Sequence, residues 1–209
     1  MTAADDVPDD LLQRAAAGDA DALAALFLRC RDRLKRMVQL RLDRRLSGRV
    51  DPSDVLQEAY LEVHKRFAEY SRTAGPPFFL WLRLVTGQKL TDFHRRHLGA
   101  QMRDAGQEVS LYRGALPQAS SASLAAQLLG RLTSASQAAV RAETQVRVQE
   151  ALNGMEPIDR EILTLRHFEM LTNEEAAEVL GLRKSAASNR YIRALKRLKD
   201  ALGEWPGAA

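Results

Sequence analysis

Apolar residues recur every three to four positions along most of the chain, which is the spacing of one buried face on a helix. Such a stripe predicts a long helix after Asp19, whose carboxylate suits an N-cap; its members are Phe27, Cys30, Leu34, Val38 and Leu42. A shorter helix is expected over residues 9–17, ended by Gly18. No segment shows convincing strand alternation, so the sequence predicts an all-α fold.

Two further helices are expected in the first half of the chain. The stretch "DPSDVLQEAYLEVHKRF" has Asp51 as a cap and Pro52 at the first helical position, and its helix is expected to end near Tyr70. The sequence Gly75-Pro76-Pro77 then breaks helical structure. Helical spacing resumes over about residues 78–97.

The C-terminal third contains the spacing of a helix-turn-helix. Thr172 and Glu175 form a capping box at the start of one helix, and Gly181 provides the turn after it. The small residue Ala177 lets a second helix, beginning around Lys184, approach closely. At about 100° per residue, a buried face of this second helix is expected to hold Ala187, Tyr191, Ala194 and Leu198.

The opposite face of the second helix carries side chains that read DNA. Ser, Asn and Arg reach base edges in the major groove, and Lys and Arg neutralise phosphates; on this face they are Ser185, Asn189, Arg193 and Lys196. From Arg183 to Lys199 the chain has seven basic residues and no acid. A solvated basic surface is the alternative, which the capped helix and tight turn disfavour.

Composition divides the chain into two helical modules. Residues 104–137 contain 20 Ser, Ala, Gln or Gly among 34 positions, which is typical of a linker, with a short helix allowed near Leu124–Leu132. The expected domains are therefore 1–103, a linker 104–137 and 138–209.

Charge and composition narrow the functional classes. The net charge of +4 fits a polyanionic partner. A single cysteine excludes an intramolecular disulfide and a multi-cysteine zinc site. No apolar run approaches the roughly 20 residues of a membrane span, and no signal peptide is evident, so a cytoplasmic protein without membrane insertion is expected. No nucleophile–base set, phosphate loop or metal cluster is apparent, so we expect no enzyme, no cofactor and no metal site.

The N-terminal module has two exposed surfaces of interest. Asp54, Gln57 and Leu61 lie opposite the buried stripe of their helix, and an exposed leucine beside an acid and an amide favours a protein partner. On the next helix, Trp81, Gln88 and Arg95 lie near one face, and such aromatic, amide and cationic groups suit melted nucleic acid. In the alternative interpretation Trp81 is core and Asp92 pairs with Arg95 or Arg96.

These segments, in this order, resemble bacterial sigma factors of the extracytoplasmic-function (ECF) group of the sigma-70 family. "DPSDVLQEAYLEV" is similar to the family's polymerase-binding helix, "WLRLVTGQKLTDFHRR" to its minus-ten segment, and "PIDREILTLRHFEMLTNEEAAEVLGLRKSAASNRYIRAL" to its minus-thirty-five-reading domain. The resemblance departs from the usual pattern at Gln88, where Asn is common, and at Ala186-Ala187-Ser188-Asn189 in the recognition helix.

The resemblance implies a role in promoter recognition and a set of residues for each contact. Core RNA polymerase, through its largest-subunit clamp and its flap, would meet Asp54, Gln57, Glu58 and Leu61. The minus-ten element would meet Trp81, Gln88, Lys89, Arg95 and Arg96. The minus-thirty-five element would meet Arg183, Lys184, Ser185, Ala186, Ser188, Asn189, Arg190, Arg193, Lys196 and Arg197. An anti-sigma factor is a further candidate partner.

Two other functions remain open from the sequence. One is a helix-turn-helix regulator that acts without core polymerase and binds a palindromic operator as a dimer. The other is a helical interaction protein that occupies polymerase without promoting initiation.

Overall fold

The computed structural model describes residues 7–46, 48–73, 75–98, 116–130 and 138–202. These residues form helices and no strand, so the predicted all-α class is confirmed. The chain divides into two compact units, Met1–Pro117 (unit 1) and Gln118–Ala209 (unit 2).

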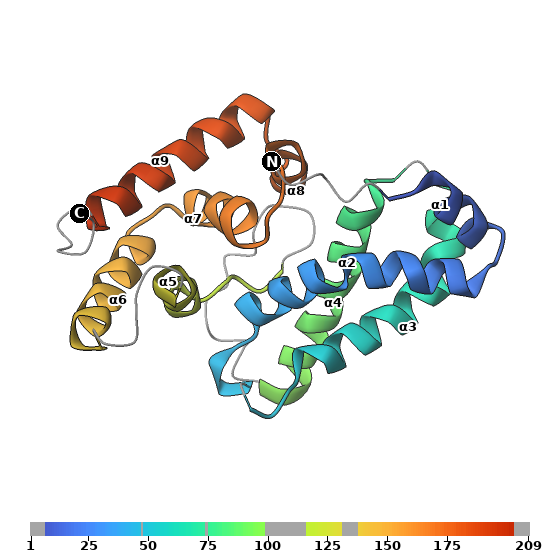
Figure 1. Cartoon of the computed structure of the whole chain (residues 1–209), viewed down its shortest axis with the longest axis horizontal. Helices are drawn as coiled ribbons and strands as arrows, with labels where there is room; N and C mark the ends of the chain where they lie inside the picture. Colours follow the sequence, from blue (N-terminus) through green and yellow to red (C-terminus); the bar gives the residue numbers. More distant parts are fainter. Residues whose placement is uncertain (1–6, 47, 74, 99–115, 131–137, 203–209) are drawn as a thin grey trace. The chain divides into compact units, whose positions relative to one another are not determined.

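Unit 1 is a small bundle built around two long helices. Its elements are α1 (Asp9–Ala16), α2 (Ala20–Arg41), the 3₁₀ turn η1 (Arg44–Leu46), α3 (Pro52–Tyr70) and α4 (Phe78–Leu98). Helices α2 and α3 run alongside each other and α4 crosses them (Figure 1).

The helix starts in unit 1 follow from local side-chain caps. The Asp19 carboxylate accepts hydrogen bonds from the backbone N–H groups of Asp21 and Ala22, both at 3.0 Å. Asp51 caps α3 in the same way, accepting from the Ser53 N–H at 2.7 Å. Both caps confirm the predictions from sequence, because each satisfies backbone donors that have no partner inside the helix.

The predicted apolar stripes form the core of unit 1. The α2 stripe is buried throughout, with Leu34 and Val38 fully inaccessible, and so are Val55, Ala59 and Val63 of α3. The first half of α4 is buried on nearly every side, because both α2 and α3 pack against it.

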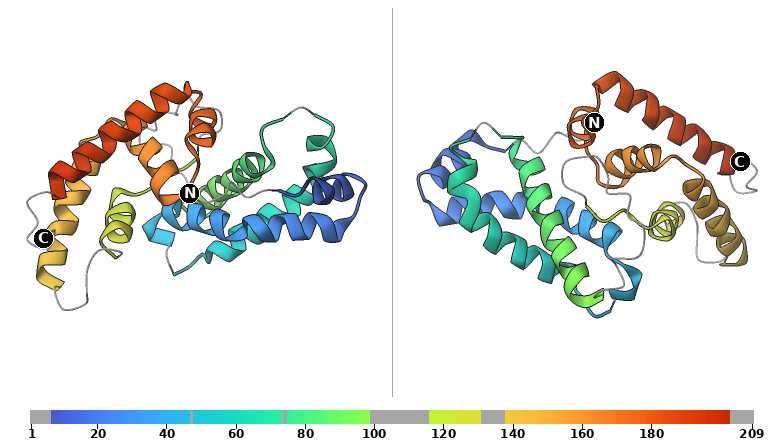
Figure 2. Two further views of the ribbon diagram at one scale, coloured as in Figure 1. Left: turned by 45° about the horizontal axis from the view of Figure 1, so that its top comes forward. Right: turned by 180° about the vertical axis from the view of Figure 1, so that it is seen from behind.

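Unit 2 contains the helix-turn-helix. Its elements are α5 (Ser121–Gly130), α6 (Ala138–Asn153), α7 (Pro157–Leu163), a π-helical turn (Thr164–Phe168), α8 (Asn173–Leu180) and α9 (Lys184–Leu202). Helix α9 spans the unit, with α8 at one end and α6 at the other, and α7 packs against it between them (Figure 2).

The described part of the predicted linker is packed rather than free. Leu116 and Pro117 lie in unit 1, where the Arg41 guanidinium donates to the Pro117 carbonyl at 2.9 Å. Helix α5 belongs to unit 2 and buries Leu124 and Leu129, so unit 2 begins before residue 138. Residues 104–115 and 131–137 of the predicted linker lie outside the described residues.

Candidate nucleic-acid and polymerase interfaces

A capping box and a left-handed glycine position the recognition helix α9. The Thr172 N–H donates to the Glu175 carboxylate at 2.7 Å, and the Glu175 N–H donates to the Thr172 hydroxyl at 3.1 Å. Gly181 has φ +64°, a conformation that costs a residue with a side chain about 1–2 kcal/mol. The turn then directs α9 away from α8, as the sequence predicts.

Asn173 ties the two helices of the motif together. Its side-chain amide donates to the Lys184 carbonyl at 2.9 Å, at the first residue of α9, and its oxygen accepts from Arg166 at 3.0 Å. The Arg166 guanidinium also lies 4.5 Å from the centre of the Tyr191 ring. Tyr191 is therefore held in packing contacts, in agreement with the inner face expected for it.

One face of α9 is buried and the opposite face is open. Ala187, Ala194 and Leu198 are buried, which confirms the predicted inner face. Arg183, Ser185, Asn189 and Lys196 are exposed, whereas Ala186 and Ser188 are partly buried. In the described part of the chain, no side-chain hydrogen bond or ion pair engages these four exposed residues.

Four other cations of the predicted minus-thirty-five set are bonded within unit 2. Arg190 donates to the fully buried carboxylate of Asp159 at 2.7 Å and to Glu156 at 3.0 Å, and these bonds, first that to Asp159, raise the pKa of Arg190. Arg197 donates to the Gly154 carbonyl at 3.0 Å. Arg193 and Lys184 make ion pairs as well, at 3.6 Å and 2.5 Å. Arg190 thus holds α9 on α7, a role that its sequence position does not reveal.

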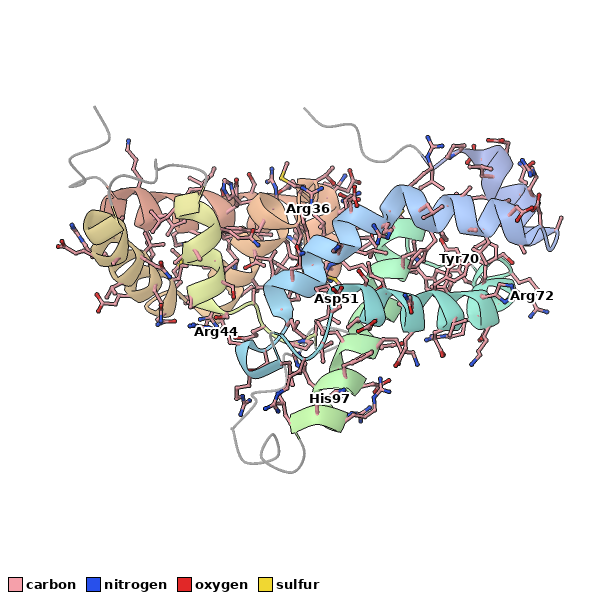
Figure 3. The ribbon with its side chains drawn as sticks, turned by 60° about the horizontal axis from the view of Figure 1, so that its bottom comes forward. Arg36, Arg44, Asp51, Tyr70, Arg72 and His97 are labelled. Carbon is pink, nitrogen blue, oxygen red and sulfur yellow. The ribbon has the colours of Figure 1, made fainter. Side chains whose placement is uncertain are left out.

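The exposed side of α3 carries the predicted polymerase-binding residues. Gln57 and Leu61 are open, with Leu61 60% exposed. Asp54 is also exposed, but its carboxylate accepts from the Asp51 N–H at 3.4 Å and completes a capping box at the start of the helix. Asp51 marks this end of α3 in Figure 3, and Tyr70 and Arg72 mark the other.

Trp81 lies in the aromatic core of unit 1 rather than on its surface. It is 6% exposed, and its ring stacks on Tyr70 with centroids 4.3 Å apart. Phe67 and Phe78 complete the cluster, and the Tyr70 hydroxyl donates to the Pro76 carbonyl at 3.0 Å. This agrees with the alternative in which Trp81 is core, and contact between Trp81 and a DNA base would require this cluster to open.

The other predicted minus-ten residues on α4 are all bonded within unit 1. Gln88 accepts from Arg66 at 2.9 Å, and the Lys89 ammonium lies 3.1 Å from Glu62. The described bonds of the two arginines are Arg95 to Asp92 and Arg96 to Glu58, the second at 2.8 Å. Glu58, expected to meet polymerase, therefore neutralises a residue that is expected to meet DNA.

Sequence reasoning missed Glu62 and Asp159. Glu62 lies one turn after Glu58, and a helical wheel of α3 set against α4 could have found it. Asp159 is an acid in the first turn of a helix that starts at Pro157, and it has no local signal of burial because its partners come from α9.

Metal and membrane sites were also sought. Among the residues that the structure describes, no cluster of three or more His, Cys, Asp or Glu side chains could hold a metal ion. No described helix is both long enough and apolar enough to cross a membrane.

Comparison with known proteins agrees with this geometry. The family model "Sigma-70, region 4" matches residues 145–198, which contain the helix-turn-helix. The chain is 29% identical over 194 residues to the ECF RNA polymerase sigma factor SigD of Mycobacterium tuberculosis (strain ATCC 25618 / H37Rv), covering 93% of this chain and 83% of SigD. It is 28% identical over 195 residues to SigK of Mycobacterium sp. (strain KMS), covering 93% and 90%.

A solved structure has the same fold. CnrH, solved in complex with the cytosolic domain of CnrY, is 22% identical with a TM-score of 0.55, over 95% of this chain and 98% of CnrH. An all-α chain with an exposed recognition helix and a region 4 match belongs to the sigma-70 class of transcription initiation factors. Within that class it is a member of the ECF RNA polymerase sigma factors, as the match to SigD and SigK over most of its length indicates.

Proposed function

We propose that this sigma factor divides promoter recognition between its two units. Unit 1 binds core RNA polymerase through α3 and meets the minus-ten element through α4, and unit 2 reads the minus-thirty-five element through α9. The chain acts in transcription initiation, and polymerase supplies the chemistry. The observation that carries the assignment to unit 2 is the open face of α9 with Ser185, Asn189 and Lys196, presented by a capped helix and a tight turn.

The same proposal places the protein in the cytoplasm, where promoter DNA and polymerase are found. It also includes a protein antagonist of the anti-sigma type. The support for this partner is the structure of CnrH, which was solved with the cytosolic domain of CnrY bound.

Reconstituted run-off transcription tests the proposed function. Core polymerase with this protein should produce discrete transcripts from a subset of candidate genomic promoters, and core polymerase alone should not. A protein that binds an operator tightly as a dimer and ignores core polymerase would instead be a stand-alone regulator. A protein that binds core polymerase without producing any transcript would be an interaction protein.

A further inference from the structure

The polar side chains of α4 that are expected to meet DNA are covered by acids of unit 1. The Arg96 Nη2 atom donates to both carboxylate oxygens of Glu58, at 2.8 and 2.9 Å. Lys89 Nζ lies 3.1 Å from Glu62 Oε2 and 3.8 Å from Asp92 Oδ2. We call Glu58, Glu62 and Asp92 the carboxylate screen.

The carboxylate screen follows from the register of α3 against α4. Glu58 and Glu62 are one turn apart on α3, and Lys89 and Arg96 are two turns apart on α4, so each acid lies opposite a base. An open hollow of about 510 Å³ lies among these groups, lined by Glu58, Lys89, Asp92, Arg95 and Arg96. Its cations are where a strand's phosphates would need them, and acids already hold them.

These ion pairs are exposed enough to be exchanged. The Arg96 and Glu58 side chains are 51% and 38% exposed, and such surface pairs are weak because water and salt compete for them. A phosphate can replace a carboxylate on Arg96, but it must then displace the carboxylate and face its repulsion. The carboxylate screen therefore lowers DNA affinity without blocking the site.

Glu58 has a second neighbourhood that the other two acids lack. It follows Gln57 directly and lies one turn before the exposed Leu61, on the helix proposed to dock on polymerase. A partner that binds this side of α3 competes with Arg96 for the Glu58 carboxylate.

We propose that the carboxylate screen keeps the free sigma factor from holding single-stranded DNA, and that docking of α3 on polymerase withdraws Glu58 and releases Arg96 for the strand. This inference rests on the proposed function, because it takes α3 as the polymerase-binding helix and α4 as the DNA-binding helix. Binding of polymerase and binding of DNA to unit 1 then favour each other, and the coupling passes through Glu58.

The first test uses the full-length chain without polymerase. Its binding to a fluorescein-labelled, mixed-sequence 12-nucleotide single strand is followed by anisotropy at several salt concentrations. Glu58→Gln should bind about fivefold more tightly than wild type, as the loss of one surface ion pair permits. Its plot of log affinity against log salt should steepen by about 0.7, because Arg96 then displaces a counterion from the strand.

Matched variants separate the screen from general electrostatics. Glu69→Gln removes the same charge from an exposed site on α3, and it should stay within twofold of wild type. Glu58→Gln combined with Arg96→Gln should bind no better than Arg96→Gln alone. If Glu69→Gln gains as much as Glu58→Gln, or if the gain survives without Arg96, the carboxylate screen is refuted.

The second test measures the coupling itself. The affinity of core polymerase for the labelled sigma factor is determined with and without the same single strand. The strand should increase this affinity several-fold for wild type, and by a clearly smaller factor for Glu58→Gln. Equal factors would remove Glu58 as the link. A wild-type chain that binds no polymerase at all would instead overturn the proposed function, and the comparison made on the free chain would still stand.

Discussion

Met170 adopts a backbone conformation that favours glycine. It has φ +62° in the loop between the π-helical turn and α8, and it is the one described non-glycine residue with a positive φ. Its side chain is 39% exposed, so little apolar burial compensates the strain. Met170→Gly should stabilise unit 2 by about 0.5–1 kcal/mol, after the extra entropy of glycine in the unfolded chain is subtracted. Urea unfolding measures the change.

The control for this prediction is Met170→Ala, which removes the side chain and keeps the strained φ. It should not stabilise the protein. If Met170→Gly were no more stable than Met170→Ala, relief of backbone strain would not be the cause.

Asn189 and Lys196 are both exposed on α9, and they should act on DNA in different ways. Asn189 has the amide that pairs with a base edge, so Asn189→Ala should change base preference at one position of the upstream element, by about 1–3 kcal/mol. Lys196 has only charge to offer a phosphate, so Lys196→Ala should weaken all promoters alike and reduce the salt slope by about one. Binding of the holoenzyme to a promoter library measures both. A uniform loss with Asn189→Ala would remove it from base reading.

At the level of helices, α3 combines a stability role and a binding role on one exposed side. Gln57 and Leu61 have no part in the described cap, so changing both to Ala should reduce polymerase capture at least tenfold with little effect on unfolding. Asp54→Ala is a poorer test, because loss of the capping box costs about 1 kcal/mol in itself. A pull-down with core polymerase measures capture, with Glu69→Ala as the exposed control. Undiminished capture by the double variant would move the docking surface elsewhere.

The junction between α2 and α4 should be sensitive to acid. The buried His94 ring accepts a hydrogen bond from the Asp43 N–H at 3.2 Å, so it is neutral, and burial lowers its pKa. The nearby Asp43 has its pKa lowered to about 2, chiefly by its hydrogen bond from Arg45, and it stays ionised at moderately low pH. Because the unfolded His94 takes up a proton first, unit 1 should lose stability as the pH falls below about 6.5, by at most about 1.4 kcal/mol per pH unit.

His94→Gln is the matched variant for this prediction, since glutamine keeps an acceptor and does not titrate. Its stability measured from pH 7.5 to 5 should be flatter than that of wild type. Parallel curves would exclude His94 as the titrating group.

For the whole molecule, the sequence was sufficient where structure is decided locally. Caps at Asp19, Asp51 and Thr172 fixed the helix starts, and Gly181 fixed the turn, because each acts through backbone groups a few residues away. The candidate sites were harder to predict. The Glu58–Arg96 pair joins residues 38 positions apart, so it depends on how α3 crosses α4, and helical periodicity contains no information on that register.

The buried polar anchors were missed for the same reason. Asp159 has the appearance of an ordinary first-turn acid, and only the approach of α9 turns it into a buried partner of Arg190 and Arg193. Sequence reasoning thus identified which faces are exposed, and the structure identified which exposed charges already have partners. For a DNA-binding protein the second point decides which cations are available to phosphate.

The two compact units should unfold as separate bodies, and Asp159 offers a way to test this. Asp159→Asn leaves the Arg190 charge partly buried with only Glu156 as its partner, so unit 2 should lose about 3 kcal/mol. Unit 1 contains no partner of Asp159 among the described residues, and its stability should be unchanged. Hydrogen exchange followed by mass spectrometry measures both units in one sample, with peptides from α2 and α3 reporting on unit 1 and peptides from α7 and α9 on unit 2. A matching increase of exchange in unit 1 would mean that the units fold as one cooperative body.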